Sequence, residues 1–207
     1  MIYDITPPVT PSLAVWPGDT PPSREVLRDM DRGESLTLST LRATVHLGAH
    51  ADAPSHYGRD APTIDQRPIE RYLGPAQVIR VAADRGGTVS PERLGGPVRA
   101  ERVLLATGTY PDVEAFHRDF AALTVDLVEF LHGHGVVLIG TDTPSVDRFA
   151  STDLPVHEAC LRRDIAILEG LVLDAVPEGV YELIALPLRL VGFDASPVRA
   201  ILRTTSG

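Results

Sequence analysis

The apolar residues of this chain fall mainly into short runs and broken alternations, a pattern that favours strands over helices. Near-continuous apolar runs predict strands buried on both faces of a sheet at 102–107, 136–139 and 165–168. Looser runs predict further strands at 1–5, 36–45, 75–82, 181–186 and 200–202. Prolines and glycines between these runs mark turns. We therefore expect a fold built around a sheet.

Two segments predict helices. Residues 124–133 carry apolar side chains at helical spacing, with Thr124 suited to begin the helix and Gly133 to end it. Residues 155–163 predict a second, short helix. Strands and helices do not alternate cleanly, and no internal repeat or composition shift marks a boundary. The sequence predicts a single mixed α/β domain, 1–207, with a partly closed, barrel-like central sheet flanked by helices.

Composition narrows the class of protein. With 43% hydrophobic and 23% charged residues, the chain can bury a sizeable core without disulfides. Its one cysteine, Cys160, excludes an intramolecular disulfide and fits a reducing compartment. The net charge of −9 argues against nucleic acid as a partner. No signal-like start or long apolar run is present, so we expect a cytoplasmic protein that does not enter a membrane.

The most unusual stretch is H-L-G-A-H-A-D-A-P-S-H, from His46 to His56, which holds three of the seven histidines. It also contains Asp52. Imidazole nitrogens and carboxylate oxygens suit zinc or a similar divalent ion. A loop in which histidines cluster by chance is the plainer alternative, but four potential ligands in so short a stretch favour a metal site.

The spacing of these residues constrains the backbone. At about 3.3 Å per residue, His46 and His50 would lie about 13 Å apart in a straight strand. Two imidazoles on one zinc ion must both come within about 2.1 Å of it, so the chain has to bend between them. Gly48 permits the bend, and Pro54 discourages a helix. We predict a strand running into His46, a tight turn at Gly48, and an irregular loop carrying the remaining ligands.

A catalytic metal site also needs ligands from distant parts of the chain. His157, near a predicted helix start, and Glu169, at the end of an apolar strand, are the candidates, although a surface histidine and a capping or salt-bridged glutamate fit the same pattern. Glu158 is a rival ligand on chemistry alone. Trp16, the only tryptophan, precedes a Pro-Gly turn and suits either core packing or an aromatic wall.

The run H-x-G-x-H-x-D-A-P-x-H-Y resembles the signature of the metal-dependent, cyclase-like amidohydrolases, and among them the family of bacterial kynurenine formamidases. The resemblance spans nearly the whole chain, through W-P-G-D from Trp16, Y-L-G-P from Tyr72, T-D-T-P-S from Thr141, Y-E-L-I-A-L-P-L from Tyr181 and D-A-S-P-V-R-A from Asp194. The family often has Thr where this chain has Leu47 and Ala49, and residues 107–119 match least well.

The resemblance implies the site and its chemistry. The metal ligands would be His46, His50, Asp52, His157 and Glu169, with Asp52 and Glu169 bridging two Zn²⁺ ions per subunit, and with Mn²⁺ or Co²⁺ as possible substitutes. Hydroxide formed at the metal would attack the formyl group of an aryl formamide. The expected reaction is hydrolysis of N-formyl-L-kynurenine to L-kynurenine and formate, in tryptophan degradation.

Two further residues and the assembly follow from the same resemblance. His56 would be the catalytic acid/base, and Trp16 would lie against the substrate in a swivelling β/β/α fold. The family also implies a homodimer. Three rival functions remain. A related amidohydrolase such as an isatin hydrolase would share the ligands. A catalytically silent module that binds metal or a small molecule is another, but the chain retains every ligand and His56, which argues against it. A serine hydrolase would need a G-x-S-x-G elbow, which the sequence lacks, because Ser55 merely precedes His56.

Overall fold

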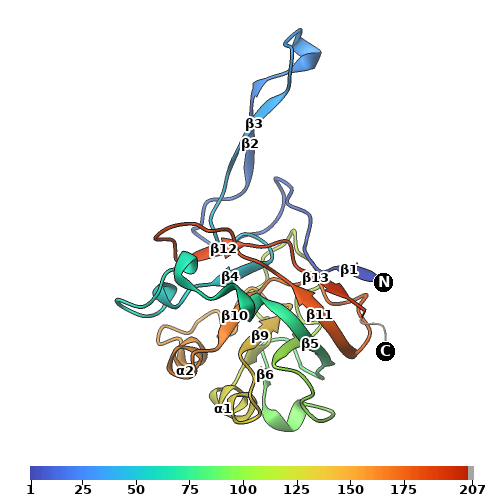
Figure 1. The fold of residues 1–207 in the computed structure, drawn as a ribbon, viewed down its shortest axis with the longest axis vertical. Helices are drawn as coiled ribbons and strands as arrows, with labels where there is room; N and C mark the ends of the chain where they lie inside the picture. The colour runs from blue at the N-terminus through green and yellow to red at the C-terminus, as the bar shows by residue number, and fades with distance from the viewer. Residues whose placement is uncertain (205–207) are drawn as a thin grey trace.

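The computed structural model describes residues 1–204, so the last three residues of the expected 1–207 domain lie outside it. Its main sheet has nine strands. Their order across the sheet is β1 (Ile2–Asp4), β13 (Ile201–Arg203), β11 (Gly179–Ile184), β5 (Leu73–Arg80), β7 (Arg102–Ala106), β9 (Leu138–Thr141), β10 (Ala166–Glu169), β4 (His50–Asp52) and β12 (Ala195–Pro197). Figure 1 shows the sheet curling, with both helices on one side of it. The predicted α/β fold with a partly closed sheet is confirmed.

The central strands β5, β7, β9 and β10 run parallel and are mostly buried, which explains their continuous apolar sequence. In β7, Val103 and Leu105 point toward the helices α1 (Val125–Gly133) and α2 (Pro155–Arg163) and share a cluster with Leu127 of α1. The intervening Leu104 points to the other face, inside the curl of the sheet. The sheet is therefore covered on both faces.

Both helices form where the sequence predicts them. The Thr124 side chain accepts a hydrogen bond from the backbone N–H of Leu127 and caps the start of α1. Helix α2 begins at Pro155, whose fixed φ and missing N–H suit the first turn of a helix. Among the described residues, no helix is both long and apolar enough to cross a membrane.

One edge of the sheet explains how side chains from distant segments meet. Strand β4 lies between β10 and β12 and pairs antiparallel with both. Its register sets His50 opposite Glu169, so these two side chains lie on the same face of the sheet. Asp52 follows two residues later and points to that face as well. Three potential ligands thus converge at the end of β10.

The prediction of a half-buried strand over 36–45 that delivers His46 is wrong. Strand β3 (Leu38–Arg42) is exposed along its whole length and pairs only with β2 (Ser23–Arg28). Figure 1 shows this hairpin projecting away from the body of the molecule. Its apolar side chains do not pack against the core. Leu41, for example, is 65% exposed. His46 lies beyond the hairpin, in irregular chain.

The prediction of an irregular loop after Gly48 is also wrong, since His50 and Asp52 belong to β4. The turn itself is confirmed, because Gly48 has a φ of 56°. The sequence analysis also missed several short strands: β2, β12, and the separate pair β6 (Thr88–Val89) and β8 (Ala122–Leu123). The described residues also form short 3₁₀ turns: η1 (Met30–Arg32), η2 (Pro54–His56), η3 (Ile64–Gln66), η4 (Ile69–Tyr72) and η5 (Pro91–Arg93).

Candidate metal centre

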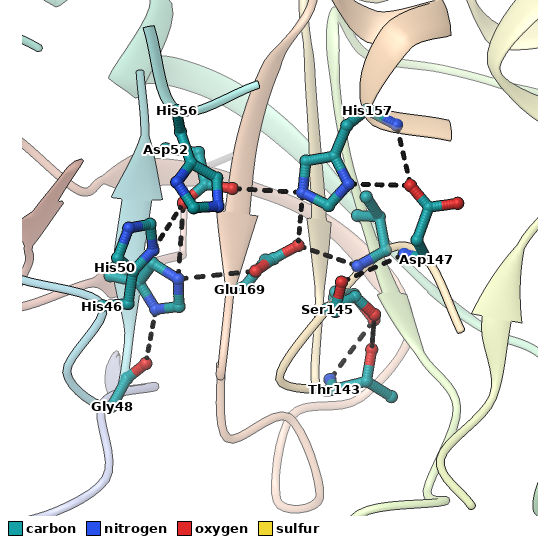
Figure 2. A network of polar contacts seen from close by, with 12 residues as sticks. His46, Gly48, His50, Asp52, His56, Thr143, Ser145, Asp147, His157 and Glu169 are labelled. Carbon is teal, nitrogen blue, oxygen red and sulfur yellow. Dashed lines mark hydrogen bonds and ion pairs between the residues drawn. The ribbon is translucent and has the colours of Figure 1, made fainter. Parts of the chain in front are cut away.

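Three histidines and two carboxylates meet beside the paired strands β4 and β10 (Figure 2). His50 Nε2 lies 3.4 Å from Asp52 Oδ1 and 3.4 Å from Glu169 Oε2. His157 Nε2, on α2, lies 3.4 Å from Asp52 Oδ2 and 3.6 Å from Glu169 Oε1. His46 Nδ1 lies 3.1 Å from Asp52 Oδ1. The structure therefore brings together all five residues that the sequence singles out as metal ligands.

Each of these histidines has its second ring nitrogen held by an acceptor outside the cluster. His50 Nδ1 donates to the carbonyl oxygen of Gly48 at 2.9 Å. His157 Nδ1 is 2.8 Å from Asp147 Oδ2, and His46 Nε2 is 3.0 Å from Asp194 Oδ2. Such contacts fix the tautomer and orientation of an imidazole whose other nitrogen binds metal. In all three residues, the remaining nitrogen faces the cluster.

Asp147 also fixes the helix that carries His157. Its carboxylate accepts the backbone N–H groups of Val156 and His157, each at 3.1 Å, in the first turn of α2. Burial acts to raise the pKa of Asp147, but these hydrogen bonds and the one from the His157 ring hold the pKa below its ordinary value. Asp147 is therefore an anionic anchor for both the helix terminus and the imidazole.

The cluster holds buried negative charge and a ring nitrogen without a hydrogen-bond partner, as a cation site does. Asp52 is 1% exposed, and neither of its oxygens has hydrogen-bond geometry with any residue in the described chain. His50 Nε2 is buried and lacks such a partner as well. A bare carboxylate in this environment is costly unless a positive charge faces it. A divalent ion held by His and carboxylate ligands fits these atoms.

In the metal-free protein, protons provide part of that positive charge. Burial acts to lower the pKa of His46, but the close contact with the Asp52 carboxylate, 3.1 Å away, and its negative charge outweigh burial and raise this pKa to about 9. Burial likewise acts to lower the pKa of His157, yet its hydrogen bond with Asp147 and its close contact with the Asp52 carboxylate raise this pKa to about 10. Two protonated histidines therefore face the carboxylates at neutral pH, and a metal ion would replace their protons.

His56 lies beside the cluster and differs from the three other histidines. It is the last residue of η2, its side chain is 35% exposed, and its ring centroid lies 4.2 Å from that of His46. Burial lowers the pKa of His56, so its imidazole is neutral near pH 7. Its Nδ1 lies 3.5 Å from Asp194 Oδ2. His56 can therefore accept a proton at the edge of the cluster.

A cavity of about 590 Å³ opens over these residues, within the usual size range of small-molecule sites. Its lining includes His46, His50, His56 and an apolar wall with Trp16 and Phe116. Trp16 is half-buried, and its ring centroid lies 5.4 Å from that of Phe116. Trp16 therefore forms the aromatic wall that the sequence analysis allowed as one of two options.

The segment that contributes Phe116 is held by a buried carboxylate. Asp142 accepts hydrogen bonds from the Thr107 hydroxyl at 2.6 Å and from the Gly108 N–H at 2.8 Å. Burial raises the pKa of Asp142. These contacts fix the start of the 107–119 region, in which the sequence analysis assigned no residue to the site.

The structure separates the remaining candidates. Glu158, the rival ligand, lies on the exposed side of α2 with a carboxylate oxygen 3.8 Å from Arg162. The buried Ser55 hydroxyl has no hydrogen-bond partner in the described chain, so no Ser–His pair is formed there.

Sequence reasoning missed Asp147 and Asp194. Asp194 is separated from His46 by 148 positions, and only the fold brings the two together.

Comparison with known proteins defines the class. A family model described as a putative cyclase matches residues 3–148, so the chain belongs to this putative cyclase family. Within it, the resemblance to kynurenine formamidases is confirmed. The kynurenine formamidase of Bordetella petrii is 46% identical over 98% of this chain and 97% of that protein, and the one of Bordetella avium is 45% identical with the same coverage.

Solved structures agree on the fold. One described as a potential metal-dependent hydrolase with cyclase activity has a TM-score of 0.85 and 27% identity, over 98% of this chain and 96% of that one. Isatin hydrolase A from Ralstonia solanacearum has a TM-score of 0.81 over 98% of this chain and 91% of that one. Its identity is 24%, which indicates a common fold alone.

Proposed function

We propose that this chain is a zinc-dependent arylformamidase that hydrolyses N-formyl-L-kynurenine to L-kynurenine and formate in tryptophan degradation. The observation that carries the proposal is the buried cluster of histidines and carboxylates at the base of a cavity with an aromatic wall. The 46% identity to a kynurenine formamidase over nearly the full chain supports the choice of substrate.

In this proposal, His46, His50, Asp52, His157 and Glu169 would together hold the two Zn²⁺ ions. The unpartnered Asp52 oxygens and the inward-facing imidazole nitrogens support these roles. Mn²⁺ and Co²⁺ suit the same ligand set. Bound there, a divalent ion supplies a Lewis acid that lowers the pKa of water and polarises a carbonyl group.

His56 carries the proton in the hydrolysis. Its neutral imidazole takes a proton from the attacking water, whose oxygen forms the new bond to the formyl carbon. As the C–N bond breaks, His56 gives that proton to the departing aniline nitrogen. The products are the free arylamine and formic acid, which releases its proton to water and leaves as formate, and His56 returns to its neutral form. The partial exposure of His56 toward the cavity supports this role, because the side chain can reach a bound substrate.

Trp16 and Phe116 hold the aryl ring of the substrate. Both line the cavity, and their rings meet edge to face, an arrangement that aromatic pairs favour. A flat ring placed against this wall excludes water from the side opposite the histidines. The formyl group then points toward His56 and the buried carboxylates.

The main alternative is a related amidohydrolase that opens a cyclic amide, such as isatin. Isatin hydrolase A has the same fold, and an enzyme of that kind would share the metal ligands and differ in the cavity wall. A catalytically silent metal-binding module is a weaker alternative. It gives no reason for a neutral histidine, His56, to lie at the cavity edge of the cluster.

We also propose that the enzyme is a cytoplasmic homodimer. The projecting β2–β3 hairpin supports association, because it exposes apolar side chains that no other part of the described chain covers, including Leu27 (53%), Met30 (60%) and Leu41 (65%). The single buried thiol of Cys160 is compatible with a reducing compartment.

The test compares two substrates with one preparation of enzyme. Formate release from N-formyl-L-kynurenine and ring opening of isatin are measured before chelation, after chelation and after zinc is restored. We expect hydrolysis of the linear formamide that is lost on chelation, returns with zinc, and falls at least about 100-fold in His56→Ala. Opening of isatin without hydrolysis of the formamide would favour the alternative. Inactivity toward both by the zinc-loaded protein would overturn the enzyme assignment.

A further inference from the structure

Asp194 contacts both a proposed metal ligand and the proposed acid/base. One oxygen, Oδ2, lies 3.0 Å from His46 Nε2 and 3.5 Å from His56 Nδ1. A carboxylate oxygen has two lone pairs and can accept from both rings. The longer contact is of the kind that commonly shortens when a substrate completes an active site. Asp194 also lines the cavity.

The backbone around Asp194 is fixed relative to the metal ligands. Asp194 directly precedes β12, which pairs with β4 so that Ala195 lies opposite Asp52. The Asp194 carbonyl accepts the N–H of Ala53 at 2.8 Å, one residue beyond Asp52. The position of the carboxylate is therefore set by the same strand that carries His50 and Asp52.

The two nitrogens of His46 have different partners. Nδ1 faces Asp52 inside the cluster, whereas Nε2 faces Asp194 outside it. These contacts favour a positioning role for Asp194 over direct metal binding.

We propose that Asp194 is a positioning residue that couples the metal site to the acid/base. It accepts the Nε2 proton of His46, leaving Nδ1 for metal, and it accepts the Nδ1 proton of His56, leaving Nε2 for the substrate. The inference rests on the proposed function of His56. It assigns to Asp194 the fixed tautomer of His56, in which Nδ1 carries the proton and the unprotonated Nε2 is left to accept a proton in the cavity.

Asp194→Asn tests this role, with Asp65→Asn as the matched control. Asparagine keeps the size of the side chain, but it removes the negative charge and can present an N–H donor in place of an acceptor. Asp65 lies near the same segment, where its carboxylate accepts the Gly192 N–H at 3.0 Å, and it contacts none of the site histidines. Both variants remove one negative charge, and only Asp194→Asn removes the acceptor that faces the two histidines.

Three readouts are made on zinc-loaded protein with N-formyl-L-kynurenine as substrate. At saturating zinc, we expect kcat of Asp194→Asn to fall about 100-fold with KM changed less than about 3-fold. Zinc affinity falls about 10-fold, because His46 loses its acceptor. Long-range ¹H–¹⁵N NMR of the histidine rings shows the His56 proton on Nδ1 in the wild type and no longer confined there in the variant. Asp65→Asn leaves all three unchanged.

Specific results overturn the proposal. If excess zinc restores full kcat to Asp194→Asn, then Asp194 serves His46 only and the coupling to His56 is wrong. An unchanged His56 tautomer has the same meaning. If the wild type does not hydrolyse N-formyl-L-kynurenine at all, the proposed function fails instead. Zinc affinity and the NMR tautomers then still decide whether Asp194 holds the two rings.

Discussion

Gly170 offers a sharp test of how the proposed metal ligands are held. It directly follows Glu169 and has a φ of 66°, a conformation that side chains other than glycine rarely adopt. A Cβ placed on Gly170 would lie 2.2 Å from the carbonyl oxygen of Gly48, the group that accepts the His50 Nδ1 proton. Because the obstacle is backbone, Gly170→Ala must move either Glu169 or the partner of His50.

The size of the effect follows from two contributions. Placing an alanine in the left-handed region costs about 1–2 kcal/mol. Relieving the overlap with Gly48 costs about a further 1–3 kcal/mol, as overpacking usually does. Gly135→Ala is the matched control, because Gly135 has a φ of 80° and no atom within 4 Å of a built Cβ. It should incur only the first cost.

The assay is urea unfolding of both metal-free variants, followed by zinc titration. Gly170→Ala should lose about 2–5 kcal/mol of unfolding free energy and bind zinc about 10-fold more weakly. Gly135→Ala should lose about 1–2 kcal/mol and bind zinc normally. Equal losses in both variants, or wild-type zinc affinity in Gly170→Ala, would refute the claim that the contact between Gly170 and Gly48 sets the ligand geometry.

Three other predictions follow from the site and the hairpin. In metal-free protein, the raised pKa values of His46 (about 9) and His157 (about 10) contribute stability that is full below pH 6.5 and is lost as pH rises toward 10. The urea midpoint should therefore fall over that range, and a flat profile would contradict the protonated cluster. Phe116→Ala should raise KM about 10-fold with little change in kcat. A fall in kcat of about 10-fold would instead show that the Phe116 ring also stabilises the transition state. Leu41→Glu should give a monomer by light scattering at concentrations where the wild type is a dimer, and an unchanged mass would remove the hairpin from the interface.

The sequence predicts the central part of the fold because that part is governed by local patterns. The apolar run of β7 and the capped, periodic segment of α1 form the elements that their residues favour. The hairpin was misjudged because a broken apolar alternation looks the same whether its apolar face meets a core or projects from the body, as the side chain of Leu41 does. Alternation fixes the side-chain period, and it does not identify what covers the apolar face.

Part of the candidate site, like the central part of the fold, could be predicted from local sequence. Clustering of His46, His50 and Asp52 indicates a metal site without any fold, whereas His157 and Glu169 needed the family resemblance to be chosen. The short strand β4 could not be foreseen, because its hydrogen bonds come from β10 and β12, more than a hundred residues away.

Asp147 and Asp194 show what the sequence leaves out. Each carboxylate acts through the imidazole that it holds, and its role depends on a distance set by the fold. Neither has a spacing relative to its histidine that would mark it in the sequence. Acceptors that orient metal-binding histidines therefore have to be found in three dimensions.

The central claim is that the buried cluster makes the protein a metal-dependent hydrolase of N-formyl-L-kynurenine. The most direct measurement is the rate of formate release from this substrate as zinc is added stepwise to the chelated, metal-free enzyme. We expect no hydrolysis without zinc and a rate that rises and levels off at about two ions per chain. Full activity in the metal-free enzyme, or none at any zinc loading, would contradict it.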